Sequence, residues 1–75
     1  MTEIQRQPVS SSDIASIGYD AAAETLEIEF KATGIYRYFS VPKTVWEELA
    51  RTPSPGKLFL QHIKGKYAWE KIGRD

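Results

Sequence analysis

One short segment of this sequence alternates strictly between apolar and acidic side chains. Leu26, Ile28 and Phe30 alternate with Glu27 and Glu29, a period of two that is typical of a β-strand with one buried and one wet face. Residues 25–30 therefore predict a strand of an antiparallel sheet. The rest of the chain has to cover the apolar face of that sheet.

The chain is small and has no covalent reinforcement. It contains 75 residues and no cysteine, and a domain of this size buries only about 60% of the surface that its unfolded chain exposes. Disulfides and Cys-rich zinc sites are excluded, so two Trp, four Tyr and three Phe residues must supply much of the packing. We expect a flexible N-terminal arm at residues 1–12, one domain at residues 13–72 and a short tail at residues 73–75.

Two more strands are expected, one before and one after this first strand in the sequence. Residues 14–19 and 35–41 are rich in apolar, aromatic and β-branched side chains, as strands usually are. A turn at residues 20–24 and a hairpin loop at residues 31–34 would join them, with Gly34 supplying a positive φ. Pro8 limits any strand in the arm to a sheet edge.

Two short helices follow the third strand. The first runs from Pro42 to Arg51, with Val45 and Leu49 on its packed face. The second begins after Ser54 as the N-cap and ends near Gly65. Its buried stripe is predicted to consist of Phe59, Leu60 and Ile63. The fold class is therefore α+β, a three-stranded antiparallel meander packed by two short helices, with residues 66–72 lying back against the domain.

The charge is balanced overall but divided along the chain. Residues 1–50 carry four basic and eight acidic side chains, whereas residues 51–75 carry six basic and two acidic ones. This division predicts a dipolar domain with a basic C-terminal half. The absence of a long apolar run or a signal-like start favours a cytoplasmic protein without a membrane partner.

Catalysis finds little support in the residues. His62 is the only histidine, and no cysteine or carboxylate arrangement completes a metal site or a triad around it. Glu27 and Glu29 read as a solvated strand face rather than as paired acids. No phosphate-binding or dinucleotide fingerprint occurs, so we predict no cofactor, no metal, no evident small-molecule substrate and no enzymatic activity.

The segment Tyr36-Arg37-Tyr38 is the first candidate binding site. Side chains alternate along a strand, so the two rings share one face and Arg37 lies on the other. A three-residue loop at residues 32–34 would place both rings on the core side, whereas a two-residue turn at residues 33–34 would expose them as a stacking platform. The core-side register is favoured, because the other turns Arg37 inward.

Two further candidate sites lie in the basic half. Ser54 and Lys57 lie at a helix start whose free backbone amides could bind a phosphate group. Ordinary helix capping also explains this segment, and it is the favoured interpretation. Lys64 and Lys66, together with Lys71, interleave with aromatic residues, as on nucleic-acid surfaces. Lysine stems that cover a small core would give the same pattern.

An ordered set of short motifs over residues 8–72 resembles the KTSC domain, named from the C-terminus of some lysyl-tRNA synthetases and also found as a small stand-alone bacterial or phage protein. Tyr36-Arg37-Tyr38 corresponds to the YxY motif of that family. The other matching residues are Val9-Ser10-Ser11-Ser12, Ile17-Gly18-Tyr19-Asp20, Phe30, Val41-Pro42, Gly56-Lys57, Phe59, Ile63-Lys64 and Tyr67.

The chain departs from the family pattern at two points. It has Leu58-Phe59-Leu60 where Tyr-Phe-Asn is common, and Trp69 where a tyrosine is usual. The resemblance implies the α+β fold and a suggested role in binding RNA.

We therefore expect a non-catalytic RNA-binding domain in which Tyr36, Arg37 and Tyr38 contact bases. The candidate phosphate contacts are Ser54, Lys57, Lys64 and Lys66. The alternative is a protein-interaction module that engages a larger partner through its acidic half or an exposed sheet edge. Catalysis with groups supplied by a partner is a weaker third hypothesis.

Overall fold

The computed structural model describes residues 4–73, which form one sheet and two helices. The elements in chain order are β1 (Arg6–Pro8), β2 (Ile14–Asp20), β3 (Thr25–Phe30), β4 (Gly34–Tyr38), α1 (Lys43–Arg51), α2 (Pro55–His62) and β5 (Trp69–Gly73).

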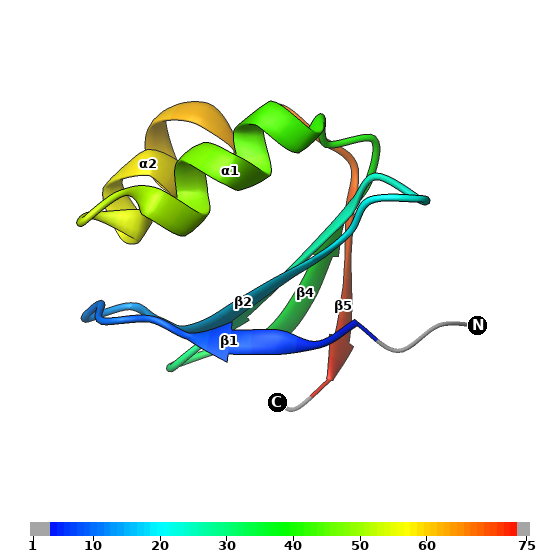
Figure 1. The fold of residues 1–75 in the computed structure, drawn as a ribbon. Helices are drawn as coiled ribbons and strands as arrows, with labels where there is room; N and C mark the ends of the chain where they lie inside the picture. Colours follow the sequence, from blue (N-terminus) through cyan, green and yellow to red (C-terminus); the bar gives the residue numbers. More distant parts are fainter. Residues whose placement is uncertain (1–3, 74–75) are drawn as a thin grey trace.

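The sheet is antiparallel throughout, and its five strands lie in the order of the sequence. Both helices lie on one of its faces, inserted in the chain between β4 and β5 (Figure 1). The α+β class and the two helices on an antiparallel sheet were predicted. The expected number of three strands was wrong, because β1 and β5 extend the meander at its two edges.

The two added strands carry weak sequence signals. β1 has three exposed residues and includes Pro8, which sits at the sheet edge as expected. It approaches β2 closely at Gly18, where a Cβ atom would lie 2.4 Å from the carbonyl oxygen of Gln5. Residues 6–8 are thus paired with β2, where the sequence suggested a loose arm. In β5, Trp69 and Ile72 remain 57% and 39% exposed, so pairing with β4 rather than burial defines the strand.

The β3–β4 hairpin has a register different from both that were considered. Leu26 lies opposite Tyr38 and Ile28 opposite Tyr36, which leaves residues 31–33 as the loop. Gly34 has a φ of 116°, as expected for the glycine at the end of this turn. The register is shifted by two residues from the favoured one. A shift by an even number keeps both tyrosines on the core side.

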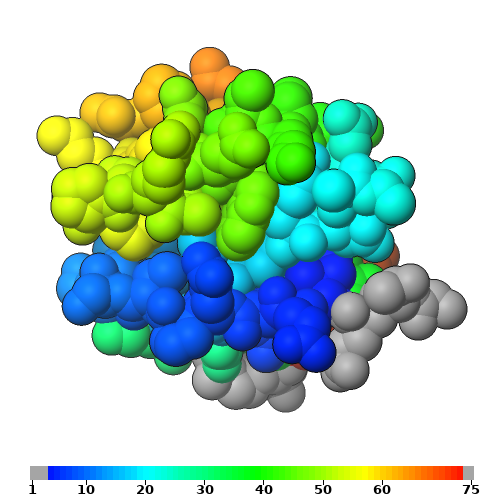
Figure 2. Space-filling model, viewed as in Figure 1, coloured from blue at the N-terminus to red at the C-terminus, as the bar shows by residue number. Residues whose placement is uncertain are grey.

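The helices close the core over the sheet. In α1, Leu49 is buried, Val45 and Trp46 are partly buried, and the adjacent glutamates face water. In α2, Phe59 is buried, but Leu60 is 59% exposed, so the prediction that Leu60 belongs to the buried stripe was wrong. From the side shown in Figure 2, green and yellow helix residues lie directly on blue and cyan residues of the sheet edge. No described helix is long and apolar enough to cross a membrane.

Candidate functional site

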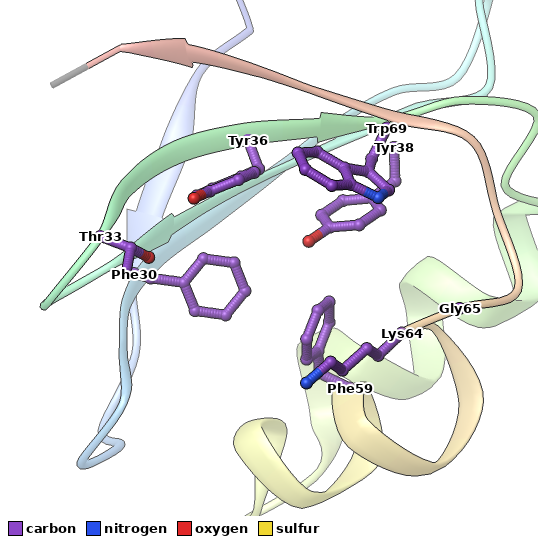
Figure 3. Close-up of a pocket in the computed structure, with 8 residues that line it drawn as sticks. All are labelled: Phe30, Thr33, Tyr36, Tyr38, Phe59, Lys64, Gly65 and Trp69. Atoms are coloured by element: carbon purple, nitrogen blue, oxygen red, sulfur yellow. The ribbon is translucent and has the colours of Figure 1, made fainter. Parts of the chain in front are cut away.

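An aromatic pocket of about 300 Å³ opens between the sheet and α2 (Figure 3). Phe30 of β3, two tyrosines of β4 and Trp69 of β5 form the sheet side, whereas Phe59 comes from α2. The residues that line it are Phe30, Thr33, Tyr36, Tyr38, Phe59, Lys64, Gly65 and Trp69. We refer to this set as the aromatic pocket.

The rings of the pocket form one connected series. Trp69 contacts Tyr36 with ring centroids 5.4 Å apart, and Tyr36 meets Phe30 edge-on at 5.6 Å. Phe30 then meets Phe59 at 5.0 Å, and Phe59 meets Tyr38 at 5.5 Å, both in edge-to-face geometry. Such contacts add about 0.5–1.5 kcal/mol per pair beyond area burial. The wall of the pocket is therefore held in place by packed rings.

Lysines provide the charge at this pocket. Lys64 extends from the segment after α2 and lines the pocket together with Phe59 (Figure 3). Lys71 lies opposite Tyr36 in the β4–β5 pair, as Trp69 lies opposite Tyr38. Directly opposed residues share a face, so Lys71 projects on the pocket side of the sheet. The described residues that line the pocket include no acidic side chain.

The two central tyrosines differ in exposure. Tyr38 is 6% exposed and belongs to the core, whereas Tyr36 is half-buried and lies nearer the pocket opening. Burial, and secondarily the neighbouring Tyr36, raise the pKa of Tyr38 to about 12. The Tyr38 phenol is therefore neutral at physiological pH, and its hydroxyl can both donate and accept a hydrogen bond.

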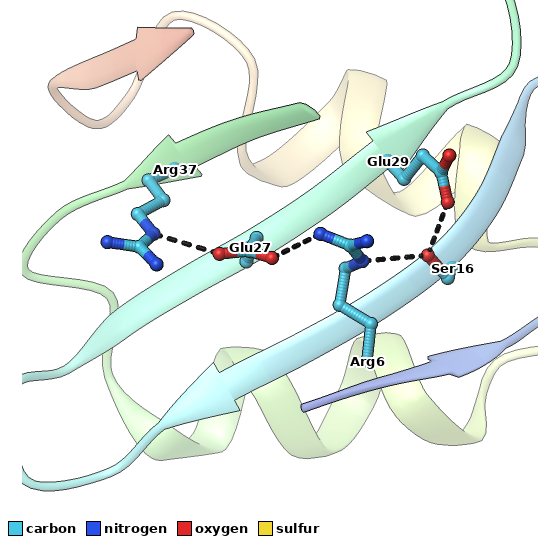
Figure 4. A network of polar contacts seen from close by, with 5 residues as sticks. All are labelled: Arg6, Ser16, Glu27, Glu29 and Arg37. Atoms are coloured by element: carbon cyan, nitrogen blue, oxygen red, sulfur yellow. Dashed lines mark hydrogen bonds and ion pairs between the residues drawn. The ribbon is translucent and has the colours of Figure 1, made fainter. Parts of the chain in front are cut away.

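Arg37 lies on the opposite face of the sheet, away from the aromatic pocket (Figure 4). Its Nε donates to Glu27 at 2.8 Å, and Arg6 of β1 pairs with the other carboxylate oxygen of Glu27. The same face carries Ser16, which accepts from Arg6 at 3.1 Å and donates to Glu29 at 2.9 Å. Arg37 is thus engaged in a polar network of the sheet, and the structure separates it from Tyr36 and Tyr38.

The remaining candidates are divided between two places. Ser54 and Lys57 line a polar depression at the start of α2, together with serines 10–12. Ser54 is the N-cap of α2, as predicted, but its hydroxyl makes no capping hydrogen bond. Lys66 is exposed in the segment that leads to β5. Of the seven candidates, the structure brings Tyr36, Tyr38 and Lys64 into one pocket.

Three aromatic residues of the pocket were not predicted as site residues. Phe30 and Phe59 look like ordinary core positions in the sequence, because each falls on the apolar face of its own element. Trp69 carried a signal, since it follows Lys64 and Lys66 in the basic half. Only the pairing of β4 with β5 shows that Trp69 lies beside the tyrosines.

The arrangement is suited to binding. Among residues 4–73 there is no group of three or more His, Cys, Asp or Glu side chains that could hold a metal ion. An apolar concave surface with a few convergent polar groups is typical of ligand sites. Here the polar groups are the hydroxyls of Tyr36, Tyr38 and Thr33 and the ammonium group of Lys64 (Figure 3).

Comparison with known proteins places the chain in a family. A KTSC domain protein from Yersinia pestis has a crystal structure that is 46% identical in sequence and superposes with a TM-score of 0.92, covering 95% of this chain and all of that one. The lysine–tRNA ligase of Trichormus variabilis is 43% identical over 61 residues, which are 81% of this chain but 11% of the ligase. An uncharacterised protein of Stutzerimonas stutzeri is 36% identical over 64 residues and is covered to 90% of its length.

The first relatives are thus much longer than this chain, which spans about a ninth of the ligase. The small proteins, in contrast, are matched over almost their whole length. The family model of the KTSC domain matches residues 10–67, which include β2, β3, β4 and both helices. This chain therefore belongs to the KTSC domain family.

Proposed function

We propose that this chain is a non-catalytic RNA-binding domain, which holds one unpaired base of single-stranded RNA in the aromatic pocket. The observation that carries the proposal is the combination of five connected rings with Lys64 at a pocket of about 300 Å³. A further support is that relatives include a lysine–tRNA ligase, a protein whose name identifies an RNA substrate.

Stacking on aromatic side chains contributes about 1–3 kcal/mol per base in complexes with single-stranded nucleic acid. Trp69 is 57% exposed and contacts Tyr36 at the pocket opening, so these two rings are the accessible stacking surface. Tyr38 and Phe59 are almost fully buried and form the floor. The pocket volume lies at the lower end of the range for ligand sites, which limits it to a single base.

Charge narrows the class of ligand. An aromatic cage without a resident cation attracts quaternary ammonium groups, but Lys64 occupies this pocket and Lys71 projects beside it. A cationic ligand would be repelled by both lysines. A base linked to a phosphate satisfies the two requirements together, because its ring can stack while Lys64 and Lys71 contact the backbone.

This site is smaller than the open stacking platform that a solvent-facing tyrosine pair would make. Both tyrosines face the core side, and Arg37 is on the other face. We therefore assign base contacts to Tyr36, Tyr38 and Trp69 and phosphate contacts to Lys64 and Lys71. Arg37, Ser54 and Lys57 fall outside the proposed contact.

Tryptophan fluorescence tests the proposal, because the chain has two tryptophans in different surroundings. Trp46 stacks on Tyr19 with ring centroids 5.6 Å apart, whereas Trp69 lies at the pocket. We expect hexauridine or hexaadenosine to quench Trp69 in the Trp46→Phe variant at low salt. The Trp69→Phe variant, which retains Trp46, should show little quenching.

Two lysine variants form the matched pair for this experiment. Lys64→Ala should weaken RNA binding and reduce the salt dependence of the affinity, because a phosphate contact is lost. Lys57→Ala, at the start of α2, should leave both unchanged. Absence of quenching, and of amide shifts at Tyr36, Tyr38 and Lys64 at high protein concentration, would rule out the RNA proposal.

A protein-interaction module is the second candidate, and the free edge at β5 favours it. In the described part of the chain, β5 pairs with β4 alone, so its other side presents backbone N–H and C=O groups to a partner strand. A strand added there would slow hydrogen exchange of the β5 amides that do not pair with β4. A base in the pocket would instead shift the ring signals of Tyr38 and Phe59.

A further inference from the structure

The hydroxyl of Tyr38 is a polar group to which no described residue offers a hydrogen bond. Tyr38 is 6% exposed, yet its hydroxyl makes no hydrogen bond within the part of the chain that the structure describes, residues 4–73. Figure 3 shows this oxygen directed into the aromatic pocket, above the ring of Phe59. It is therefore a polar atom on the floor of the aromatic pocket.

Tyr19 is a tyrosine with a structural role, and its hydroxyl does have a hydrogen-bond partner in this fold. Its ring stacks on Trp46, and its hydroxyl donates to the carbonyl oxygen of Val41 at 2.5 Å. This bond connects β2 to the segment before α1. Tyr38 has comparable ring packing, against Phe59, but lacks such a bond.

The Tyr38 oxygen remains accessible from the pocket. No fully buried side-chain nitrogen or oxygen among the described residues lacks a hydrogen-bond partner, so the unpartnered Tyr38 oxygen keeps some contact with the pocket space. A phenylalanine would fill the same position without placing a polar atom against the pocket. The neighbouring positions Phe30 and Phe59 do carry phenylalanine.

We propose that the Tyr38 hydroxyl hydrogen-bonds the polar edge of a nucleobase that enters the pocket. Tyr38 is then a specificity-determining residue, which selects an aromatic ring with polar edge atoms over an apolar ring such as a phenylalanine side chain of a peptide. This inference rests on the proposed RNA binding and defines the contact that gives it selectivity.

The geometry accommodates both parts of a base. Trp69 and Tyr36 at the opening offer their faces for stacking, while Tyr38 at the floor offers a donor and acceptor to the inserted edge. A neutral phenol can pair with either a carbonyl or an amino group of the base. A site that hydrogen-bonds its ligand in this way rejects analogues that lack the polar group, because the protein group is then left unpaired.

The test compares two single-atom deletions, Tyr38→Phe and Tyr19→Phe. Tyr38→Phe should weaken hexauridine or hexaadenosine binding about three- to tenfold, the usual effect of one neutral hydrogen bond. The same variant should unfold at an equal or higher urea concentration than the parent, because no protein hydrogen bond is lost. Tyr19→Phe should show the reverse, with a lower unfolding midpoint and unchanged RNA affinity.

Selectivity provides the second readout. A hexamer with abasic sites should bind the parent and Tyr38→Phe equally weakly, and N-acetylphenylalanine amide should gain affinity in Tyr38→Phe. The inference is overturned if Tyr38→Phe binds both RNA hexamers as the parent does, or if it loses stability as Tyr19→Phe does. In either case RNA binding by the parent would still support the proposed function, whereas no binding by the parent would remove both.

Discussion

The two faces of the sheet differ in whether their buried polar groups have hydrogen-bond partners among the described residues. On the outer face, the carboxylate of Glu27 is 3% exposed and is paired with Arg6 and Arg37 (Figure 4). On the inner face, the hydroxyl of Tyr38, one residue after Arg37, points into a pocket without a partner among the described residues. Arg37 and Tyr38, neighbours in β4, thus differ: Arg37 is hydrogen-bonded within a network, whereas the hydroxyl of Tyr38 has no such bond among the described residues.

The difference indicates which face is structural. A buried carboxylate is strongly unfavourable unless charged hydrogen bonds compensate it, and Arg6 and Arg37 compensate Glu27 from β1 and β4. Together with Ser16 of β2, the network connects four strands of the sheet and leaves little capacity for a ligand. The aromatic pocket has the capacity that the outer face lacks, which is why we assign binding to the inner face.

Removal of the carboxylate at the centre of the outer face should have the largest effect. Glu27→Ala leaves two partly buried arginines without their shared partner and should lower the free energy of unfolding by about 3 kcal/mol. Urea unfolding measures this change. Glu48→Ala, on the exposed side of α1, is the control and should change stability by no more than about 0.5 kcal/mol. A loss below about 1 kcal/mol for Glu27→Ala would mean that the network behaves like an exposed ion pair.

The contact between β1 and β2 offers a second way to disrupt the outer face. In Gly18→Ala, the added methyl group would lie 2.4 Å from the Gln5 carbonyl oxygen, so β1 has to shift or detach at a cost of about 2 kcal/mol. Faster hydrogen exchange of the Val9 amide, which donates to the carbonyl oxygen of Ala15 in β2 at 3.1 Å, should accompany the loss of stability. Gly56→Ala, within α2, is the matched control, because the nearest atom to the added methyl group would be Oδ2 of Asp13 at 3.5 Å. Equal effects of the two substitutions would contradict the close approach at Gly18.

Alkaline pH probes the inner face. Burial raises the pKa of Tyr38 to about 12 from the ordinary 10.0, so the unfolded state loses this proton before the folded state does. The stability contribution of the neutral phenol is complete below pH 10 and is lost as the pH rises toward 12, by up to about 2 kcal/mol. Unfolding curves at several alkaline pH values should show a smaller loss in Tyr38→Phe than in the parent. If the parent and Tyr38→Phe lost the same stability at alkaline pH, the Tyr38 phenol would have to be exposed to water.

The smallest effect is expected at an unpartnered hydroxyl that water reaches freely. Ser54 is exposed and makes no capping hydrogen bond to α2, so Ser54→Ala should cost less than about 0.5 kcal/mol, compared with about 1 kcal/mol for a serine that caps its helix. Thermal unfolding with parallel RNA titration would measure both properties. A cost near 1 kcal/mol would show that the hydroxyl caps α2 in solution, and weakened RNA binding would extend the contact surface to this end of the helix.

Local patterns predicted the parts of the fold that depend on neighbouring residues. The strand at residues 25–30, Pro42 next to the start of α1, and Ser54-Pro55 at the start of α2 lie where expected. The strand expected at residues 35–41 ends earlier, at Tyr38, and Glu27, expected to face water, is 3% exposed. β1 and β5 were not predicted, because they are short and exposed and are defined as strands only by their pairing with β2 and β4. For the hairpin, the sequence predicted the face of the sheet on which the tyrosines lie. It did not predict which residue of β3 lies opposite each tyrosine.

The candidate site was predicted in fragments for a similar reason. Tyr36, Tyr38 and Lys64 were candidates, but the residues that enclose the pocket come from β3, α2 and β5, which are far apart in the sequence. Whether Phe59 fills a core or borders a cavity depends on how α2 sits on the sheet. Sequence periodicity gives the buried side of a helix, but it does not give the space left beside it.

The sequential order of the strands also affects how the domain forms. Each of the first four strands pairs with its chain neighbour, and β5 alone closes over the intervening helix pair. Short loop closures of this kind favour rapid folding, with the β5 closure as the step of longest range. Pairing that is mostly local is compatible with relatives in which the similar segment is nearly the whole of a small protein or a minor part of a ligase.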